Sequence, residues 1–121
     1  MASTPRARAR VGTASFVSAA PVFTALGDKT RLALVSRLCL EGPLSISELT
    51  APTRLTRQAV TKHLLVLADA GIARSERHGR EQHWRADPKR LAEVRRLLSQ
   101  ISAQWDDALI RLAEFVEREP R

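Results

Sequence analysis

The last third of the chain carries an apolar series at helical spacing that is too long for a small domain to bury alone. Asp87 and Pro88 fit the N-cap and first position of a helix. Apolar residues then recur in steps of three and four: Leu91, Val94, Leu98, Ile101, Trp105, Leu109, Leu112 and Val116. The series predicts one helix of about 30 residues with a near-heptad seam. Because such a seam needs a second helix to cover it, we expect a homodimer.

The preceding segments predict shorter helices. Residues 22–26 form an apolar helix that Gly27 can end, and Asp28 can cap a helix over residues 29–40. We expect one face of that second helix to be buried, and its apolar residues at helical spacing are Leu32, Val35, Leu38 and Cys39.

A pair of helices follows, separated by a short connection. Ser45 and Glu48 have the spacing of a capping box, which starts a short helix that ends near Ala51. Thr56 fits the N-cap of the next helix, Thr56 to Ala70, which Gly71 ends. Its buried side is expected to consist of Ala59, Val60, Leu64, Leu67 and Ala70.

Two short runs after Gly71 predict a β-hairpin. They are residues 72–77 and 81–86, separated by His78-Gly79-Arg80, and they place Trp84 on one face and His83 and Arg85 on the other. A capped helix, a short turn, a second helix and a hairpin make a winged helix-turn-helix, a mainly α fold with a small β wing. We expect this single domain over residues 20–117.

The two ends of the chain lie outside that domain. Residues 1–19 contain Arg6, Arg8 and Arg10 and no acidic residue, which predicts a disordered basic arm. Their Arg, Ser and Ala content also resembles an organelle transit peptide. Residues 118–121 are expected to form a short tail.

The positive charge is concentrated in the middle of the chain. The formal net charge is +7, and residues 54–85 hold seven basic and three acidic residues, whereas residues 87–121 hold seven of each. A local basic excess favours a polyanion as partner, and in this fold that partner is double-stranded DNA. The second helix of the pair can enter the major groove, where Arg pairs with guanine and Gln with adenine. Arg57, Gln58, Thr61 and Lys62 lie off its apolar side.

Four motifs together resemble the ArsR-type family of bacterial repressors. They are LGDKTRL at residues 26–32, PLSISEL at 43–49, QAVTKHL at 58–64 and LADAGI at 67–72. The resemblance implies a homodimer that binds a palindromic operator and is paired through its first and last helices. The implied dimer contacts are Val22, Phe23, Leu98, Ile101, Trp105, Leu109, Leu112 and Val116.

The resemblance also assigns the DNA contacts. The recognition helix contributes Thr56, Arg57, Gln58, Thr61, Lys62 and His63, and the wing tip contributes His78, Gly79 and Arg80. Arg57 and Gln58 are expected on bases or phosphates and Lys62 on a phosphate, with Arg54 a further phosphate contact. Thr61 has an alternative role as a local cap, His63 as a packing residue and Arg77 as a solvated strand charge.

No metal, cofactor or membrane is expected. A zinc site takes about four N or S ligands, and the chain offers only His63, His78, His83 and Cys39. Residues 105–116 resemble the metal-independent branch of the family, so the effector is left open. The single cysteine fits a reducing cytoplasm. No nucleophile, carboxylate pair or phosphate loop indicates an enzyme, and the alternative function is a winged-helix module that dimerises and binds another regulator.

Overall fold

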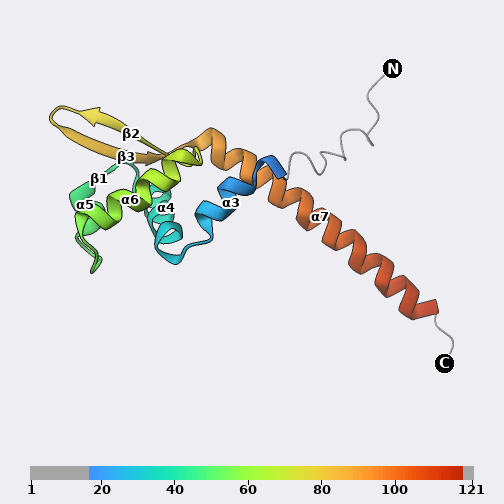
Figure 1. Cartoon of the computed structure of the whole chain (residues 1–121). Coiled ribbons are helices and arrows are strands. Elements are labelled where there is room, and N and C mark those ends of the chain that lie inside the picture. Colours follow the sequence, from blue (N-terminus) through green and yellow to red (C-terminus); the bar gives the residue numbers. More distant parts are fainter. Residues whose placement is uncertain (1–16, 119–121) are drawn as a thin grey trace, which may run out of the picture.

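The computed structural model describes residues 17–118, so most of the expected arm and residues 119–121 of the tail lie outside it. Five helices and three strands are defined in this part of the chain (Figure 1). In chain order they are α3 (Ala20–Leu26), α4 (Lys29–Glu41), β1 (Leu44–Ser45), α5 (Ile46–Thr50), α6 (Arg57–Asp69), β2 (Ala73–His78), β3 (Glu81–Ala86) and α7 (Pro88–Arg118). Ala19, which the sequence assigned to the arm, is buried and is the N-cap residue of α3.

The predicted N-caps are confirmed, and each satisfies backbone N–H groups that a helix start leaves free. The Asp28 carboxylate accepts from the Arg31 N–H at 3.0 Å, and the Thr56 hydroxyl accepts from the Ala59 N–H at 3.0 Å. Ser45 and Glu48 form the complete capping box. The Asp87 carboxylate accepts hydrogen bonds from the backbone N–H groups of Lys89 and Arg90, in the first turn of α7. Short polar side chains therefore set where α4, α5, α6 and α7 begin.

The predicted hairpin is present, and it belongs to a three-stranded antiparallel sheet. His78 is the last residue of β2 and not part of the connection, so the turn is Gly79-Arg80, with Gly79 at φ 64° in the left-handed region. The sequence did not predict β1, which pairs Leu44 with Trp84 and places the strands in the order β1-β3-β2. This pairing ties the wing to the start of α5.

The core lies where α3, α4 and α6 meet the base of the sheet. The largest fully buried side chains are Leu49, Leu64, Leu67, Ile72, Val22 and Val60. Each such aliphatic side chain contributes roughly 1.5–3 kcal/mol by leaving water. The predicted buried side of α6 is confirmed at Val60, Leu64, Leu67 and Ala70, and Ala59 is half-buried. The exposed side of α6 is thereby fixed as well.

The prediction for the buried face of α4 is confirmed at Val35 and Leu38 and wrong at Leu32 and Cys39. Cys39 is exposed and Leu32 is 54% exposed, whereas Leu34, Val35 and Leu38 are buried. The physical reason is that α3, α6 and β3 all pack against the side of α4 that carries Leu34 and Leu38, one turn apart. Cys39 therefore does not act as a core residue.

Helix α7 has an anchored half and a free half. Val94 and Leu97 are buried against the domain, whereas every residue from Ser102 to Arg118 except Ala108 is exposed. At 1.5 Å per residue the helix is about 46 Å long, and Figure 1 shows it extending well beyond α3. No helix of the described chain is long and apolar enough to cross a bilayer.

Candidate nucleic-acid interface

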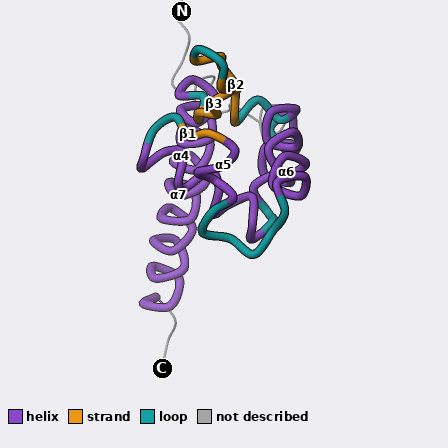
Figure 2. The backbone as a smooth tube through the Cα atoms, turned by 90° about the vertical axis from the view of Figure 1, so that its left-hand side faces the viewer, coloured by secondary structure: helices purple, strands orange, loops and turns teal. Residues whose placement is uncertain are grey.

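A rigid turn sets the angle between α5 and α6. The Thr53 hydroxyl donates to the Thr50 carbonyl at 2.7 Å and accepts from the Leu55 N–H at 3.1 Å. Leu49 and Val60 are both fully buried where the two helices pack. Figure 2 shows α5 and α6 side by side, joined by the turn. Arg54 lies exposed in the turn, and no hydrogen bond or ion pair to the described residues holds it.

The first turns of α6 present polar side chains to solvent. Gln58 and Lys62 are exposed and make no hydrogen bond or ion pair within residues 17–118. The hydroxyl of Thr61 donates to the Arg57 carbonyl at 2.8 Å, and the hydroxyl of Thr56 serves as the cap. Of the predicted contacts on this helix, Gln58 and Lys62 are therefore the ones whose side chains make no hydrogen bond or ion pair with other described residues.

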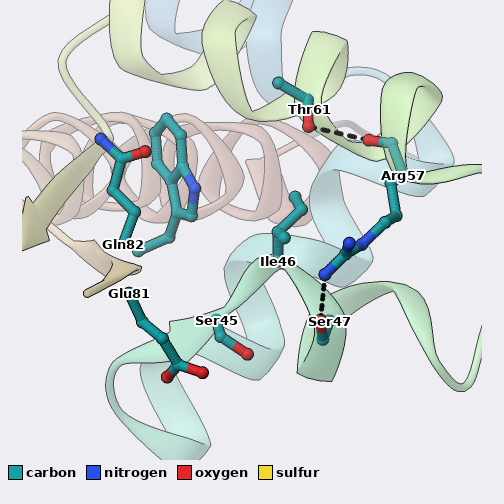
Figure 3. Close-up of a pocket in the computed structure, with 8 residues that line it drawn as sticks. Ser45, Ile46, Ser47, Arg57, Thr61, Glu81 and Gln82 are labelled. Carbon is teal, nitrogen blue, oxygen red and sulfur yellow. Dashed lines mark hydrogen bonds between the residues drawn. The ribbon is translucent and has the colours of Figure 1, made fainter. Parts of the chain in front are cut away.

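Arg57 does not extend freely from the helix. Its guanidinium donates to the Ser47 hydroxyl on α5, so the side chain lies across the space between the two helices (Figure 3). Four of the five N–H donors of an arginine remain available after one such bond. The sequence did not single out Ser47, because the two residues are separated by the turn and only the packing of α5 on α6 brings them together.

His63 is half-buried at the junction of α3, α4 and α6. Its Nδ1 lies 3.4 Å from Nη1 of Arg31 and 3.9 Å from the Asp28 carboxylate, and Arg31 also donates to the Ala25 carbonyl at 2.7 Å. The Arg31 backbone N–H, bonded to Asp28, lowers the pKa of that carboxyl. The structure thus gives His63 the surroundings of a packing residue.

The outer face of the hairpin carries a row of histidine, arginine and glutamate side chains that contact one another. The rings of His78 and His83 stack with centroids 4.7 Å apart, and their Nε2 atoms lie 3.4 Å from Glu76 and 3.1 Å from Glu81. Arg85 approaches Glu76 at 3.2 Å, and this hydrogen bond, followed by that of His78, lowers the pKa of Glu76. The described residues offer no such partner to Arg77 or to Arg80 at the tip.

A cleft of about 290 Å³ separates the start of α6 from the hairpin. Residues from β1, α5, α6 and β3 line it: Ser45, Ile46, Ser47, Arg57, Thr61, Glu81, Gln82 and Trp84. The indole of Trp84 is buried and Ile46 is half-buried, so this part of the lining is apolar. Figure 3 shows Arg57 and Ser47 on one side of the cleft and Gln82 and Glu81 on the other.

Known proteins share this arrangement. A family model described as a helix-turn-helix domain matches residues 26–76. The HTH-type transcriptional regulator Rv2034 of Mycobacterium tuberculosis is 36% identical over 95 residues, 78% of this chain and 85% of that protein. The arsenic resistance transcriptional regulator ArsR1 of Pseudomonas putida is 34% identical over 80% of this chain and 79% of its own. The chain belongs to the ArsR family of winged helix-turn-helix transcriptional regulators.

A solved structure supports the same assignment. An ArsR-like transcriptional regulator from Rhodococcus sp. RHA1 superimposes with a TM-score of 0.73 at 33% identity, over 88% of this chain and all of that one. The protein is thus a DNA-binding transcriptional regulator and not an enzyme, as the sequence predicted. Within residues 17–118 of this ArsR-family regulator, no three His, Cys, Asp or Glu side chains are grouped so as to hold a metal ion.

Proposed function

We propose that this ArsR-family regulator is a repressor that binds a palindromic operator as a homodimer in the cytoplasm. The observation that carries the proposal is the free polar start of α6, where Gln58 and Lys62 are exposed and unpartnered on a helix whose other side is locked into the core. In this fold that end of the helix enters the major groove. Gln58 is suited to pair with adenine, and Lys62 to approach a phosphate as a point charge.

The wing and the turn extend the proposed DNA surface. Arg80 at the tip and Arg54 in the turn are exposed cations without partners among the described residues. We assign both to phosphates or the minor groove, with His78 beside Arg80 and Thr56 and Thr61 at the helix surface. His63 belongs to this surface only at its edge, because Arg31 and Asp28 already surround it.

Dimerisation is proposed through the free half of α7 and the outer side of α3. Leu98, Trp105, Leu109, Leu112 and Val116 are each at least half exposed, and Ile101 is half-buried at the start of this stripe. Phe23 on α3 is half-buried, whereas Val22 is only 1% exposed and packs inside the protomer. Val22 therefore offers no surface to a partner, and Phe23 is the contact that α3 contributes.

The direct test is electrophoretic mobility shift with the DNA upstream of the protein's own gene, followed by selection from a random DNA pool. We expect a palindromic site with half-sites about 34–36 Å apart and a dimer in sedimentation velocity. Reporter transcription from that site should fall when the protein is supplied. Equal affinity for scrambled DNA would refute the specific operator, and a transcription increase would refute repression.

A further inference from the structure

Of the residues that line the cleft between α6 and the hairpin, only Thr61 belongs to the DNA surface proposed above. We propose that the cleft seats one phosphodiester group of the DNA strand, with Arg57 holding the phosphate and Ser47 positioning Arg57. This deepens the proposed function and rests on it. It makes Arg57 a backbone contact and leaves base recognition on α6 to Gln58.

The first argument is the set of hydrogen-bond donors around the cleft. Arg57 donates one N–H to the Ser47 hydroxyl, and its other N–H donors remain available. Because Ser47 accepts in that bond, its own O–H remains free to donate. On the opposite wall the Gln82 amide nitrogen donates to the Ser75 hydroxyl at 3.3 Å and points away from Arg57 (Figure 3). The donors that face the cleft are therefore the Arg57 guanidinium and the Ser47 hydroxyl, a cation and a neutral donor that can bind one phosphate together.

The second argument is the match between the cleft and a nucleotide's backbone. Trp84 and Ile46 give the lining an apolar portion beside the donors, and a deoxyribose presents C–H groups next to its phosphate. The Glu81 carboxylate also lines the cleft, where it is 3.1 Å from His83 Nε2. One carboxylate beside one guanidinium disfavours a doubly charged anion more than a singly charged phosphodiester, so the cleft fits a DNA strand better than free phosphate.

The third argument is that the Arg57 side chain is already oriented. An arginine that reads guanine must extend along the base edges with both forks free. Here its guanidinium is tied to α5, on the side of the helix that faces the hairpin (Figure 3). A strand that passes between the recognition helix and the wing meets it there. The Thr61 hydroxyl already donates its hydrogen to the Arg57 carbonyl, so Thr61 lines the cleft without donating to the phosphate.

The test couples single protein side chains to single phosphates. The full-length protein is titrated by fluorescence anisotropy against the selected operator, in which one phosphate at a time is replaced by a neutral methylphosphonate. We expect one position per half-site where this replacement weakens wild-type binding roughly tenfold. In Arg57→Ala the penalty at that position should fall below about twofold, while base preference is unchanged. Ser47→Ala should reduce the same penalty, and Ser47→Thr should restore it.

Matched variants keep the result interpretable. Ser36→Ala and Arg111→Ala remove an exposed serine and an exposed arginine outside the cleft and should leave the penalty intact. Gln82→Ala tests the opposite wall if Arg57→Ala disturbs folding, which circular dichroism will show. Wild-type binding with no position coupled to Arg57, or a change in base preference in Arg57→Ala, overturns the cleft assignment alone. No sequence-selective binding by the wild type overturns it together with the proposed function.

Discussion

Replacing Trp105 by alanine should split the dimer without unfolding the protomer. Trp105 is 65% exposed, and an aromatic side chain can bury roughly 150–250 Å², so a partner could cover about 130 Å² of it per copy. At ~25 cal/mol per Å² that is about 3 kcal/mol for each copy and about 6 kcal/mol for two. If half of this area is covered in practice, the dissociation constant rises roughly 100-fold.

Sedimentation velocity over a dilution series measures this change, and Ile110→Ala is its control. Ile110 is 56% exposed and apolar on the same free half of α7, but it lies about 140° around the helix from Trp105. We therefore expect Ile110→Ala to leave the dimer affinity unchanged. Both variants should keep the wild-type unfolding midpoint at low protein concentration, because both side chains are exposed in the protomer. Equal dissociation by the two variants, or none by Trp105→Ala, would show that this seam is not the interface.

Further predictions concern DNA and stability. Lys62→Ala should weaken binding to all DNA sequences alike and reduce the slope of log affinity against log salt concentration by about one. Gln58→Ala should relax the preference at one base pair, at a cost of about 1–3 kcal/mol. Identical sequence preference and salt dependence in the two variants would contradict these separate roles. Ser45→Ala should lower the free energy of unfolding in urea by about 1 kcal/mol because α5 loses its cap, and Ser36→Ala is the matched control. Hydrogen bonds from the backbone N–H groups of Arg90 and then Lys89 lower the pKa of Asp87 below 3.8. The stabilising effect of the Asp87 charge should be complete above about pH 3.8 and fade as the pH falls further. The free energy of unfolding of Asp87→Asn should therefore match that of the wild type only in acid. A difference in this free energy that stays constant down to about pH 2 would contradict the prediction.

The sequence predicted the features that depend on local chemistry. Asp28, Ser45, Thr56 and Asp87 start helices because each satisfies N–H groups within three residues, and the register of α6 follows from its own apolar spacing. Features that depend on distant packing were missed or misplaced. The two residues of β1 exist as a strand only because β3, about forty residues later, pairs with them.

The same limit explains the errors on α4 and at the site. Leu32, Val35 and Cys39 are three and four residues apart, and Leu34 and Leu38 are also four apart, so periodicity alone could not choose the buried face. Ser47 and Gln82 look like ordinary polar residues in the sequence. Their place beside Arg57 follows from how α5 and β3 meet α6, which no local pattern encodes.

The separation of α7 into an anchored and a free half bears on how the regulator would respond to its own abundance. The core closes within one protomer, and the residues from Ser102 to Arg118 add almost nothing to it. If the protein dimerises through this half of α7 as proposed, folding of the protomer and dimerisation are separate steps. While monomers predominate, operator occupancy grows with the square of the protein concentration, and a modest rise in expression is converted into a sharp threshold of control.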